Sequence, residues 1–332
     1  MTGASARVIS SPMEALLVRT LPEGEEWRYE PKWDGFRCLA SRDGGEVTLL
    51  SKSGKPLGRY FPEIVAMLGQ IKAGRWIVDG ELILELDGKL SFSTLQQRLH
   101  PAASRITKLA GETPASFVLF DLLMNEKGES LADTPFAERR KRLEAWFNRY
   151  QTHERLLLSP QTESLQAARA WLGSHAGSID GIVAKNIRDV YHSGERIMQK
   201  YKQAKAADCV VGGFRYGSNS AFVASLLLGL YDDSGKLNHV GFTSGLKGID
   251  KAALTQRLET LIAPPGFTGN APGGPSRWST ERSGDWQPLK PKLVVEVQYD
   301  HVSDERFRHG TKFLRWRPDK APRQCTMVQL AK

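Results

Sequence analysis

The sequence predicts an α+β fold in two domains, the first built on sheets with flanking helices and the second a small β-barrel. Its 332 residues exceed the length of a typical single domain. The first two-thirds of the chain intermixes β-like runs with amphipathic segments, whereas the part after about residue 205 consists of short strand-like runs joined by polar turns. We therefore place a domain boundary between Lys200 and Cys209, which divides the chain into residues 1–205 and 206–332.

In the first domain, runs rich in apolar and β-branched residues alternate with segments of helical spacing. The predicted strands are Phe36–Ser41, Glu46–Ser51, Trp76–Leu86, Ala115–Leu123 and Gly181–Lys185. The predicted helices are Phe61–Ile71, Ser91–His100, Ala137–Tyr150 and Ser164–Leu172. A Gly-Gly turn at residues 42–45 joins the first two strands into a hairpin. Strands and helices that intermix in this way favour an α+β domain.

The second domain is dominated by strands. They are predicted at Cys209–Arg215, Ala221–Tyr231, Leu237–Ser244, Leu293–Val302 and Thr311–Trp316. A helix is expected at Asp250–Ile262, followed by a Pro/Gly-rich loop at Pro264–Pro275. Five or so strands with one helix predict a β-barrel of the OB type, a fold that often holds nucleic acid, although another small barrel would give a similar pattern.

Composition narrows the class of protein. The net charge of +9 favours a polyanionic partner, although excess charge also aids solubility. The cysteines Cys38, Cys209 and Cys325 form no C-x-x-C pair, which argues against a zinc site or a disulfide framework and suits a reducing cytosol. No apolar stretch of about 18 residues could span a membrane, and the N-terminus lacks the pattern of a secretory signal. We therefore expect neither a membrane partner nor secretion.

The most informative motif is Glu30–Arg37 (EPKWDGFR), which places Lys32 beside an acid, a glycine and an arginine. An amine attacks only when it is unprotonated, and burial or nearby cations favour loss of the proton. Gly35 lets the backbone approach a ligand closely, Asp34 can orient the amine, and Arg37 can hold a phosphate or ribose oxygen. Taken alone, the pattern also fits a lysine on an exposed hairpin.

Further candidates adjoin the predicted strands. Glu81 lies inside an apolar strand, where a carboxylate needs a cation, a metal or a ribose hydroxyl unless it faces water on an edge strand. Phe120 follows an apolar run and could stack on a base, although an aromatic residue there also fits a core. The segment Asp180–Lys185 (DGIVAK) again joins an acid, a glycine, an apolar strand and a lysine.

Lys200 and Lys202 are two residues apart, so in a strand both side chains point the same way. Aimed at one phosphate they form a clamp, and otherwise they are two solvated lysines. Together the candidates describe a nucleotide site with a nucleophilic lysine, carboxylates for a divalent metal, an aromatic ring for the base and lysines for the triphosphate.

These ordered motifs resemble the nucleotidyltransferase motifs of ATP-dependent DNA ligases and mRNA capping enzymes. Six or seven of them follow in the same order across nearly the whole chain, which makes the resemblance specific. The matching segments are KWDGFR (Lys32–Arg37), SKSGK (Ser51–Lys55), DGEL (Asp79–Leu82), FDLL (Phe120–Leu123), DGIVAK (Asp180–Lys185), KYK (Lys200–Lys202) and RPDK (Arg317–Lys320). Phe61-Pro62-Glu63 and Trp286–Asp300 point to small bacterial ligases and the ligase domain of the ligase D family.

By this resemblance, the first domain is an ATP-grasp-like nucleotidyltransferase domain built on antiparallel sheets, and the second is an OB-fold β-barrel that carries the RPDK motif. Lys32 would attack the α-phosphate of ATP and form a lysyl-AMP phosphoramidate with loss of pyrophosphate. AMP would then pass to a DNA 5′-phosphate, and the 3′-hydroxyl would displace it to seal the nick. The implied activity is that of an ATP-dependent DNA ligase acting in DNA repair or end joining.

The resemblance also implies a role for each matching side chain. Glu81 and Asp180 would touch the ribose or hold Mg²⁺ or Mn²⁺, and the base would be read near Glu30 and stacked by Phe120. The other cations would contact sugar or phosphate: Arg37 and Lys52 the nucleotide sugar or the nick phosphate, Lys200 and Lys202 the α-phosphate, and Arg317 and Lys320 the β,γ-phosphates. The sequence departs from the family's pattern at Asp180, where a glutamate is usual, and it lacks an arginine and a tryptophan often seen after SKSG and before Lys200. These departures bear on efficiency and metal preference.

The expected ligands are ATP, Mg²⁺ or Mn²⁺, and nicked duplex DNA, bound by a monomer in the cytoplasm at the bacterial nucleoid. By analogy, a polymerase or primase and a Ku-like end binder would act in trans as repair or end-joining partners. The length and the cysteines leave no place for the nicotinamide-recognition domain and zinc module of NAD⁺-dependent ligases. Two alternatives remain: an RNA ligase or GTP-using capping enzyme, and a nucleic-acid binder without catalysis, which the intact motif residues oppose.

Overall fold

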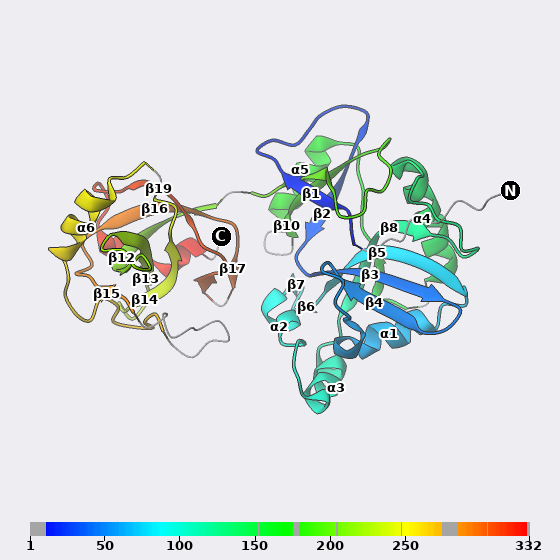
Figure 1. Ribbon diagram of the computed structural model, residues 1–332, viewed down its shortest axis with the longest axis horizontal. Coiled ribbons are helices and arrows are strands. Elements are labelled where there is room, and N and C mark those ends of the chain that lie inside the picture. The colour runs from blue at the N-terminus through cyan, green and yellow to red at the C-terminus, as the bar shows by residue number, and fades with distance from the viewer. Residues whose placement is uncertain are drawn as a thin grey trace. The chain divides into compact units, whose positions relative to one another are not determined.

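The chain folds into two units, Met1–Gln203 and Ala204–Lys332 (Figure 1). This computed structural model describes residues 11–151, 153–174, 179–203, 205–246, 248–273, 285–303 and 305–330. The sheets are mainly antiparallel and are accompanied by helices, so the predicted α+β class is confirmed. Within the described ranges, no helix has the length and apolar character needed to cross a bilayer.

Two sheets form the framework of the first unit. The smaller has the strand order β1 (Glu14–Leu17), β11 (Arg196–Tyr201), β10 (Ile179–Asn186) and β2 (Trp27–Trp33). The larger has the order β4 (Val47–Ser51), β3 (Phe36–Asp43), β5 (Arg75–Ile83), β8 (Ser116–Met124) and β9 (Leu156–Leu158). A short hairpin, β6 (Glu85–Leu86) and β7 (Lys89–Leu90), follows β5. Because β2 and β3 belong to different sheets, the turn after Lys32 carries the chain from one sheet to the other.

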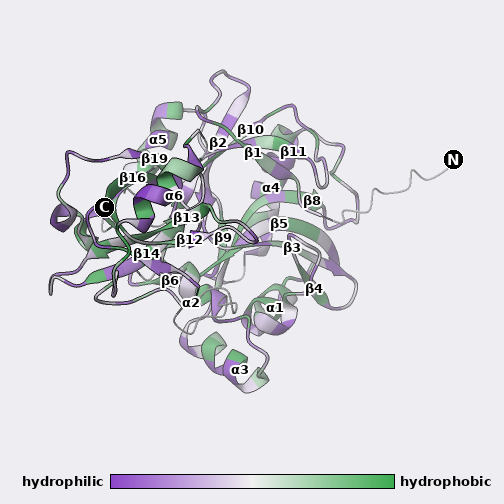
Figure 2. Cartoon of the chain, turned by 60° about the vertical axis from the view of Figure 1, so that its left-hand side comes forward, coloured by the Kyte–Doolittle hydropathy of each residue, from purple (hydrophilic) through white to green (hydrophobic). Residues whose placement is uncertain are grey.

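Helices accompany these sheets. They are η1 (Gly58–Tyr60), α1 (Pro62–Gly69), α2 (Phe92–Gln96), α3 (Ala103–Glu112), α4 (Phe136–Tyr150) and α5 (Leu165–Ser174). Of these, α1, α4 and α5 contact the strands, and α3 contacts α1. α4 buries Phe136, Leu143 and Trp146, and the Trp146 ring meets that of Trp76 in β5 edge-on at 5.8 Å between centroids. In Figure 2, α3 carries both hydrophobic and hydrophilic stretches, as expected for a helix with one face in water.

Sequence and structure differ at several places in this unit. The strands β1, β2, β9 and β11 are not among the predicted ones. The predicted strand Trp76–Leu86 ends at Ile83, because the chain then turns into the β6–β7 hairpin. The predicted helix Ser91–His100 is shortened to α2, which Ser91 caps by accepting a hydrogen bond from the Thr94 amide. We did not predict α3, which buries a single side chain, Ile106.

The second unit is built on one sheet. Its strand order is β14 (Leu237–Thr243), β13 (Val223–Tyr231), β12 (Lys205–Tyr216), β16 (Val294–Tyr299) and β19 (Lys312–Trp316), with β15 (Gln287–Pro288) beside β12. A parallel bridge between Thr243 and Thr311 connects the two ends of this order, and the Thr243 hydroxyl donates to the Thr311 carbonyl at 2.9 Å. With α6 (Lys251–Glu259) between β14 and β16, this is the topology of the predicted OB fold.

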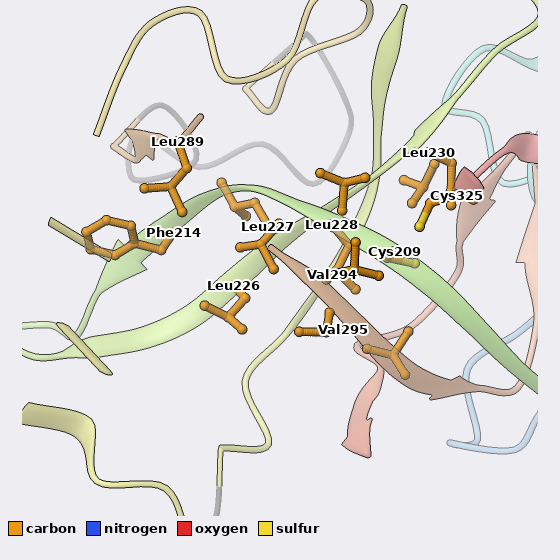
Figure 3. Packing of buried hydrophobic residues seen from close by; sticks show 14 of the residues in the cluster. Cys209, Phe214, Leu226, Leu227, Leu228, Leu230, Leu289, Val294, Val295 and Cys325 are labelled. Carbon is orange, nitrogen blue, oxygen red and sulfur yellow. The ribbon is translucent and has the colours of Figure 1, made fainter. Parts of the chain in front are cut away.

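Buried apolar side chains fill the interior of this sheet (Figure 3). Val294 and Val295 of β16 lie there with Leu228 of β13, and the thiols of Cys209 and Cys325 are buried in the same cluster. Burial raises the pKa of Cys209 well above its usual range, so this thiol packs as an apolar group. The remaining short elements are β17 (Val302–Ser303), β18 (Arg306–Phe307), η3 (Pro322–Gln324) and η4 (Met327–Leu330). The last two residues of the predicted loop Pro264–Pro275 lie outside the described residues.

A buried ion pair ties α4 to β8. The guanidinium of Arg139 donates to both carboxylate oxygens of Asp121 at 2.8 and 2.9 Å, and it also donates to the carbonyls of Thr134 and Asp189. The Arg139 and Asp121 side chains are 0% and 3% exposed. Removal of one partner would therefore leave an uncompensated charge inside the unit.

We predict that Arg139→Ala lowers the free energy of unfolding by about 3–5 kcal/mol, because Asp121 stays buried without its partner. Chemical denaturation measures this change. The matched control is Arg142→Ala on the same helix, which removes an exposed pair with Glu138 and should change the free energy by less than about 1 kcal/mol. Equal effects of the two substitutions would contradict the structural role assigned to the Arg139–Asp121 pair.

Candidate active site

The predicted nucleophile lies on β2, and a bulge in the neighbouring strand supplies its partner. Lys32 is opposite Gly181 of β10, and the register shifts between Ile179 and Gly181, so Asp180 is an extra residue in the ladder. Such a bulge can re-aim a side chain. The Lys32 Nζ donates to Asp180 Oδ2 at 2.6 Å, and the Lys202 Nζ lies 3.0 Å from the same oxygen. The side chains of Lys32 and Asp180 are 23% and 7% exposed. The carboxylate thus orients the amine.

Two glycines allow the close approaches that this arrangement needs. A Cβ on Gly35 would collide with the Leu82 carbonyl oxygen and crowd the Glu81 side chain, so only glycine lets the β2–β3 turn pass beside β5. Gly181 has a φ of 146°, and a Cβ there would collide with the Tyr201 carbonyl oxygen. The glycines of the KWDGFR and DGIVAK motifs therefore hold the backbone that carries Lys32 and Asp180 in place.

Arg37 of β3 is fixed by a buried carboxylate. It donates from Nε and Nη2 to the two oxygens of Asp79 at 2.6 and 2.7 Å, and the Tyr191 hydroxyl donates to Asp79 Oδ2 at 2.6 Å. Burial and the charge of Asp79 raise the pKa of Tyr191 well above its usual range, so this hydroxyl remains a donor. The guanidinium carbon of Arg37 lies 4.4 Å from the ring centroid of Phe120. The Phe120 ring thus already contacts a cation at the position we expected for a base.

A pocket brings most of the predicted residues together between the two sheets of the first unit. The predicted site residues that line it are Glu30, Lys32, Arg37, Lys52, Glu81, Phe120 and Lys200. Asp180 adjoins it through its contact with Lys32, and Lys202 adjoins it through its contact with Asp180. Trp33, Val183 and Met198 supply apolar wall. Glu81 belongs to β5, which lies between β3 and β8, so the alternative of an edge strand is wrong.

The electrostatics of the pocket are dominated by cations. Burial and the charges of Lys32 and Lys202 lower the pKa of Lys200. Burial alone would raise the pKa of Asp180, but the charges of Lys32 and Lys202 outweigh it and lower that pKa, so Asp180 is ionised at neutral pH. Burial raises the pKa of Glu81 to about 7, against the opposing charges of Arg37 and Lys32. The excess of positive charge in the pocket therefore favours a polyanionic ligand.

Glu30 lies deeper in the same pocket, within a network that sequence reasoning missed. Its two oxygens accept from the Lys185 Nζ at 2.7 Å and from the Gln161 Nε2 at 3.1 Å, and the Arg140 Nη1 is 3.5 Å away. Lys185 also donates to the carbonyl of Phe120 at 3.2 Å. Lys185 stood inside the DGIVAK motif and could have been singled out, whereas Gln161 and Arg140 carry no local signal.

The second unit holds the two remaining predicted residues. The Arg317 Nη1 donates to Asp208 Oδ1 at 2.8 Å, and the Lys320 Nζ donates to Asp208 Oδ2 at 2.6 Å. Arg317 also donates from Nη2 to Asp319 at 2.8 Å. The RPDK motif is therefore a pair of cations held on one carboxylate of β12.

The fold and the pocket, with its lysine on the strand that leads from one sheet to the other, define a nucleotidyltransferase of the ligase type. Residues 7–202 match the family described as the ATP dependent DNA ligase domain, and residues 219–320 match the ATP dependent DNA ligase C terminal region. The chain therefore belongs to the ATP-dependent DNA ligase family, as its motifs predicted. It is a DNA ligase that uses ATP.

Individual relatives agree with this assignment. The chain is 42% identical to DNA ligase C2 of Mycolicibacterium smegmatis, over 96% of this chain and 94% of that protein. It is 29% identical to the multifunctional non-homologous end joining DNA repair protein LigD of Mycobacterium tuberculosis, over 90% of this chain and 37% of that protein. Among solved structures, one described as mycobacterial DNA ligase D complexed with ATP and MES is similar with a TM-score of 0.52 and 28% identity, over 95% of this chain and 97% of that one.

Divalent metal use is general in this family, and the carboxylates present fit such an ion. Glu81 and Asp180 offer oxygen donors, which Mg²⁺ and Mn²⁺ prefer. Asp180 Oδ2 already binds two ammonium groups, so a positive charge suits this position. Within the described residues, no group of three or more His, Cys, Asp or Glu side chains could hold an ion by itself. Phosphate oxygens and water would therefore supply the other ligands.

The raised pKa of Glu81 predicts a pH-dependent stability. The folded protein binds this proton more tightly than the unfolded chain, so ionisation of Glu81 destabilises the fold, increasingly between the ordinary pKa of 4.5 and the folded value of about 7. Glu81→Gln should therefore raise the free energy of unfolding by about 1–3 kcal/mol at pH 8 and much less at pH 4.5. Denaturation without ATP or metal measures this, with the exposed Glu85→Gln as control. If the difference in the free energy of unfolding between Glu81→Gln and the parent does not change with pH, the raised pKa of Glu81 is contradicted.

Proposed function

We propose that this ligase seals 5′-phosphate/3′-hydroxyl nicks in duplex DNA through a covalent AMP on Lys32. The observation that carries the proposal is the 2.6 Å contact between Lys32 Nζ and Asp180 Oδ2 in a pocket lined with cations. The Lys32 amine attacks the α-phosphate of ATP, forming the N–P bond as pyrophosphate leaves. A DNA 5′-phosphate then takes AMP from Lys32, and the 3′-hydroxyl displaces AMP as it forms the phosphodiester.

Each side chain of the pocket has a proposed role in handling the nucleotide. Asp180 orients the Lys32 amine, and Lys200 and Lys202 neutralise the α-phosphate as charge develops on it. Glu30, held by Lys185, reads the base. Arg37 and Lys52 hold the sugar or the nick phosphate. Phe120 supports the base on the ring face that the Arg37 guanidinium contacts in this structure. Arg37 and the bound nucleotide therefore share the space beside this ring.

Glu81 and Asp180 would hold Mg²⁺ or Mn²⁺ together with the phosphate oxygens. When bound, such an ion supplies positive charge to the phosphate oxygens of ATP. Asp180 is one methylene shorter than glutamate, so its oxygens sit back from the pocket by about one C–C bond. Mg²⁺ demands near-ideal octahedral geometry. This position is therefore more favourable for an ion that tolerates irregular geometry, such as Mn²⁺.

We assign adenylation to residues 1–205 and a supporting role to the OB-fold domain, residues 206–332. Arg317 and Lys320 of that domain orient the β,γ-phosphates while Lys32 attacks. Because these phosphates leave as pyrophosphate, the two residues act in the first step of the reaction and not in the last. The basic side chains of both domains then hold the DNA backbone.

We place the reaction in DNA repair or end joining in the bacterial cytoplasm, at the nucleoid. The similarity to LigD, which is named as an end-joining repair protein, supports this pathway. By analogy with this end-joining protein, a polymerase or primase and a Ku-like end binder would act with the ligase in trans. Nicked DNA and ATP are the substrates in this account, and the enzyme acts as a monomer.

Lys32→Ala and Lys32→Arg should both abolish covalent labelling by α-³²P-ATP. The alanine variant lacks the nucleophile, and a guanidinium stays protonated and cannot attack. Lys72→Ala, an exposed lysine outside the motifs, is the control and should retain labelling. Acid-labile AMP on either Lys32 variant would show that another lysine is the nucleophile.

Arg317→Ala and Lys320→Ala should each slow self-adenylylation by roughly 100-fold, the effect typical of a lost electrostatic contact to a reacting group. Sealing of a nick that already carries 5′-AMP should largely survive, since no pyrophosphate leaves in that step. Rapid-quench measurement of the two reactions separates them. An equal loss in both would instead assign these residues to DNA binding or folding.

Metal preference tests the place given to Asp180. Mn²⁺ should support at least as much nick sealing as Mg²⁺, because it tolerates the set-back carboxylate better. Asp180→Glu should be active, and Asp180→Ala should lose most activity with both ions. Sealing at the parent rate by Asp180→Ala with both metals would reduce Asp180 to a structural residue at the start of β10.

A further inference from the structure

A single carboxylate of the OB-fold domain holds both cations of the RPDK motif. Asp208 lies on β12 and is 8% exposed. Its Oδ1 accepts from Arg317 Nη1 at 2.8 Å and its Oδ2 from Lys320 Nζ at 2.6 Å. Each oxygen thus binds one cation. The two cations come from one turn, while the carboxylate is more than one hundred residues earlier, since the separations are 109 and 112 residues.

The local fold explains how the two cations reach one place. The Lys320 amide donates to the Arg317 carbonyl at 3.2 Å, which closes a four-residue turn with Pro318 at its second position. The Arg317 amide donates to the Val294 carbonyl at 2.8 Å and so continues the pairing of β19 with β16. The turn begins where this strand pairing ends, next to the barrel.

Asp208 itself is held rigidly. Its amide donates to the Gln329 side-chain oxygen at 3.0 Å, and the Gln329 Nε2 donates to the Asp208 carbonyl at 3.1 Å. In the strand register Asp208 faces Glu296 of β16, and Glu296 faces Arg315 of β19. Arg315 donates to Glu296 at 2.6 Å, and the Arg317 Nη1 lies 4.0 Å from Glu296, so arginines offset the two carboxylates that face each other.

The donors left over are suited to phosphate. A guanidinium has five N–H donors, and three of those of Arg317 are used. Nη1 donates to Asp208, and Nε and Nη2 donate to Asp319. One of the three ammonium donors of Lys320 is accounted for by Asp208. The side chains of Arg317 and Lys320 are 18% and 24% exposed, so the remaining donors can meet a ligand.

We propose that Asp208 is a positioning residue for the first chemical step, which holds Arg317 and Lys320 at the spacing needed to grip the pyrophosphate portion of ATP. This inference rests on the function proposed above for the two cations. Preorganised donors accelerate a reaction because they need no reorganisation when charge develops. Asp208 acts through the positions that it gives to the two cations, because its own negative charge repels an incoming phosphate.

Geometry and charge make opposite predictions, which the full-length enzyme can distinguish. Asp208→Asn removes the negative charge, so a purely electrostatic role predicts tighter binding of pyrophosphate. Asp208→Glu keeps the charge and displaces the oxygens by about one C–C bond, so a purely electrostatic role predicts parent behaviour. A positioning role predicts that both variants slow AMP labelling on the order of 10–100-fold, the loss typical of misplaced catalytic groups.

The experiment has three readouts for each variant. They are the rate of AMP labelling with ATP, the pyrophosphate concentration that half-maximally converts the lysyl-AMP back to ATP, and the sealing of a nick that already carries 5′-AMP. Asp233→Asn, an exposed aspartate on the turn between β13 and β14, is the control with the same charge change. Thermal unfolding shows that each variant is folded.

Slow labelling and a raised pyrophosphate requirement in both Asp208 variants, with sealing of the adenylylated nick retained, are the expected result. If both Asp208 variants are labelled at the parent rate while Arg317→Ala is labelled slowly, the positioning role is overturned and the proposed function stays intact. Tighter pyrophosphate binding by Asp208→Asn, or an equal loss in labelling and sealing, would also overturn it. Parent-rate labelling by Arg317→Ala and Lys320→Ala would overturn the proposed function of these cations and this inference with it.

Discussion

The ion pair between Lys32 and Asp180 is the contact on which the rest of the site depends. It joins two neighbouring strands of the smaller sheet, and it exists because β10 carries an extra residue where Asp180 stands. The bulge needs Gly181, and the turn that follows Lys32 needs Gly35, because a side chain at either position would collide with the backbone of another strand. The glycines of the two motifs therefore place the amine and its acceptor, while the charged residues act on what enters the pocket.

The balance of charge in the pocket explains why its ligand must be an anion. Lys32, Lys200 and Lys202 lie close enough that burial and mutual repulsion lower the pKa of Lys200. Asp180 offsets part of this charge, and Glu81 offsets less because burial raises its pKa to about 7. A triphosphate would relieve the repulsion among the lysines, and a divalent ion would favour the ionised form of Glu81. Binding of ATP and metal is thus coupled to the ionisation of the site.

The fold class could be predicted from the sequence, and Lys32 could be chosen as the candidate nucleophile, because both depend on local patterns. The strand that follows the Lys32 motif and the strand that holds Glu81 were predicted from hydrophobic runs. The strands β2 and β11, which hold Lys32 and Lys200, were not among the predicted ones. The carboxylates that hold the cations could not be predicted in the same way. Asp180 reaches Lys32 across 148 residues through a bulge that has no signature of its own, and Asp208 reaches Arg317 across 109 residues. Such contacts depend on the register between strands far apart in the chain, which local patterns around each residue do not show.

The central claim is that the lysine held by Asp180 carries the nucleotide. Mass spectrometry of the enzyme after incubation with ATP and Mg²⁺ or Mn²⁺, followed by proteolysis under conditions that preserve the phosphoramidate, locates the AMP on a single residue. The account predicts that AMP is attached to Lys32 and that the modified protein loses it when pyrophosphate is added. AMP attached to Lys52, Lys200 or Lys202 in place of Lys32 would contradict the account.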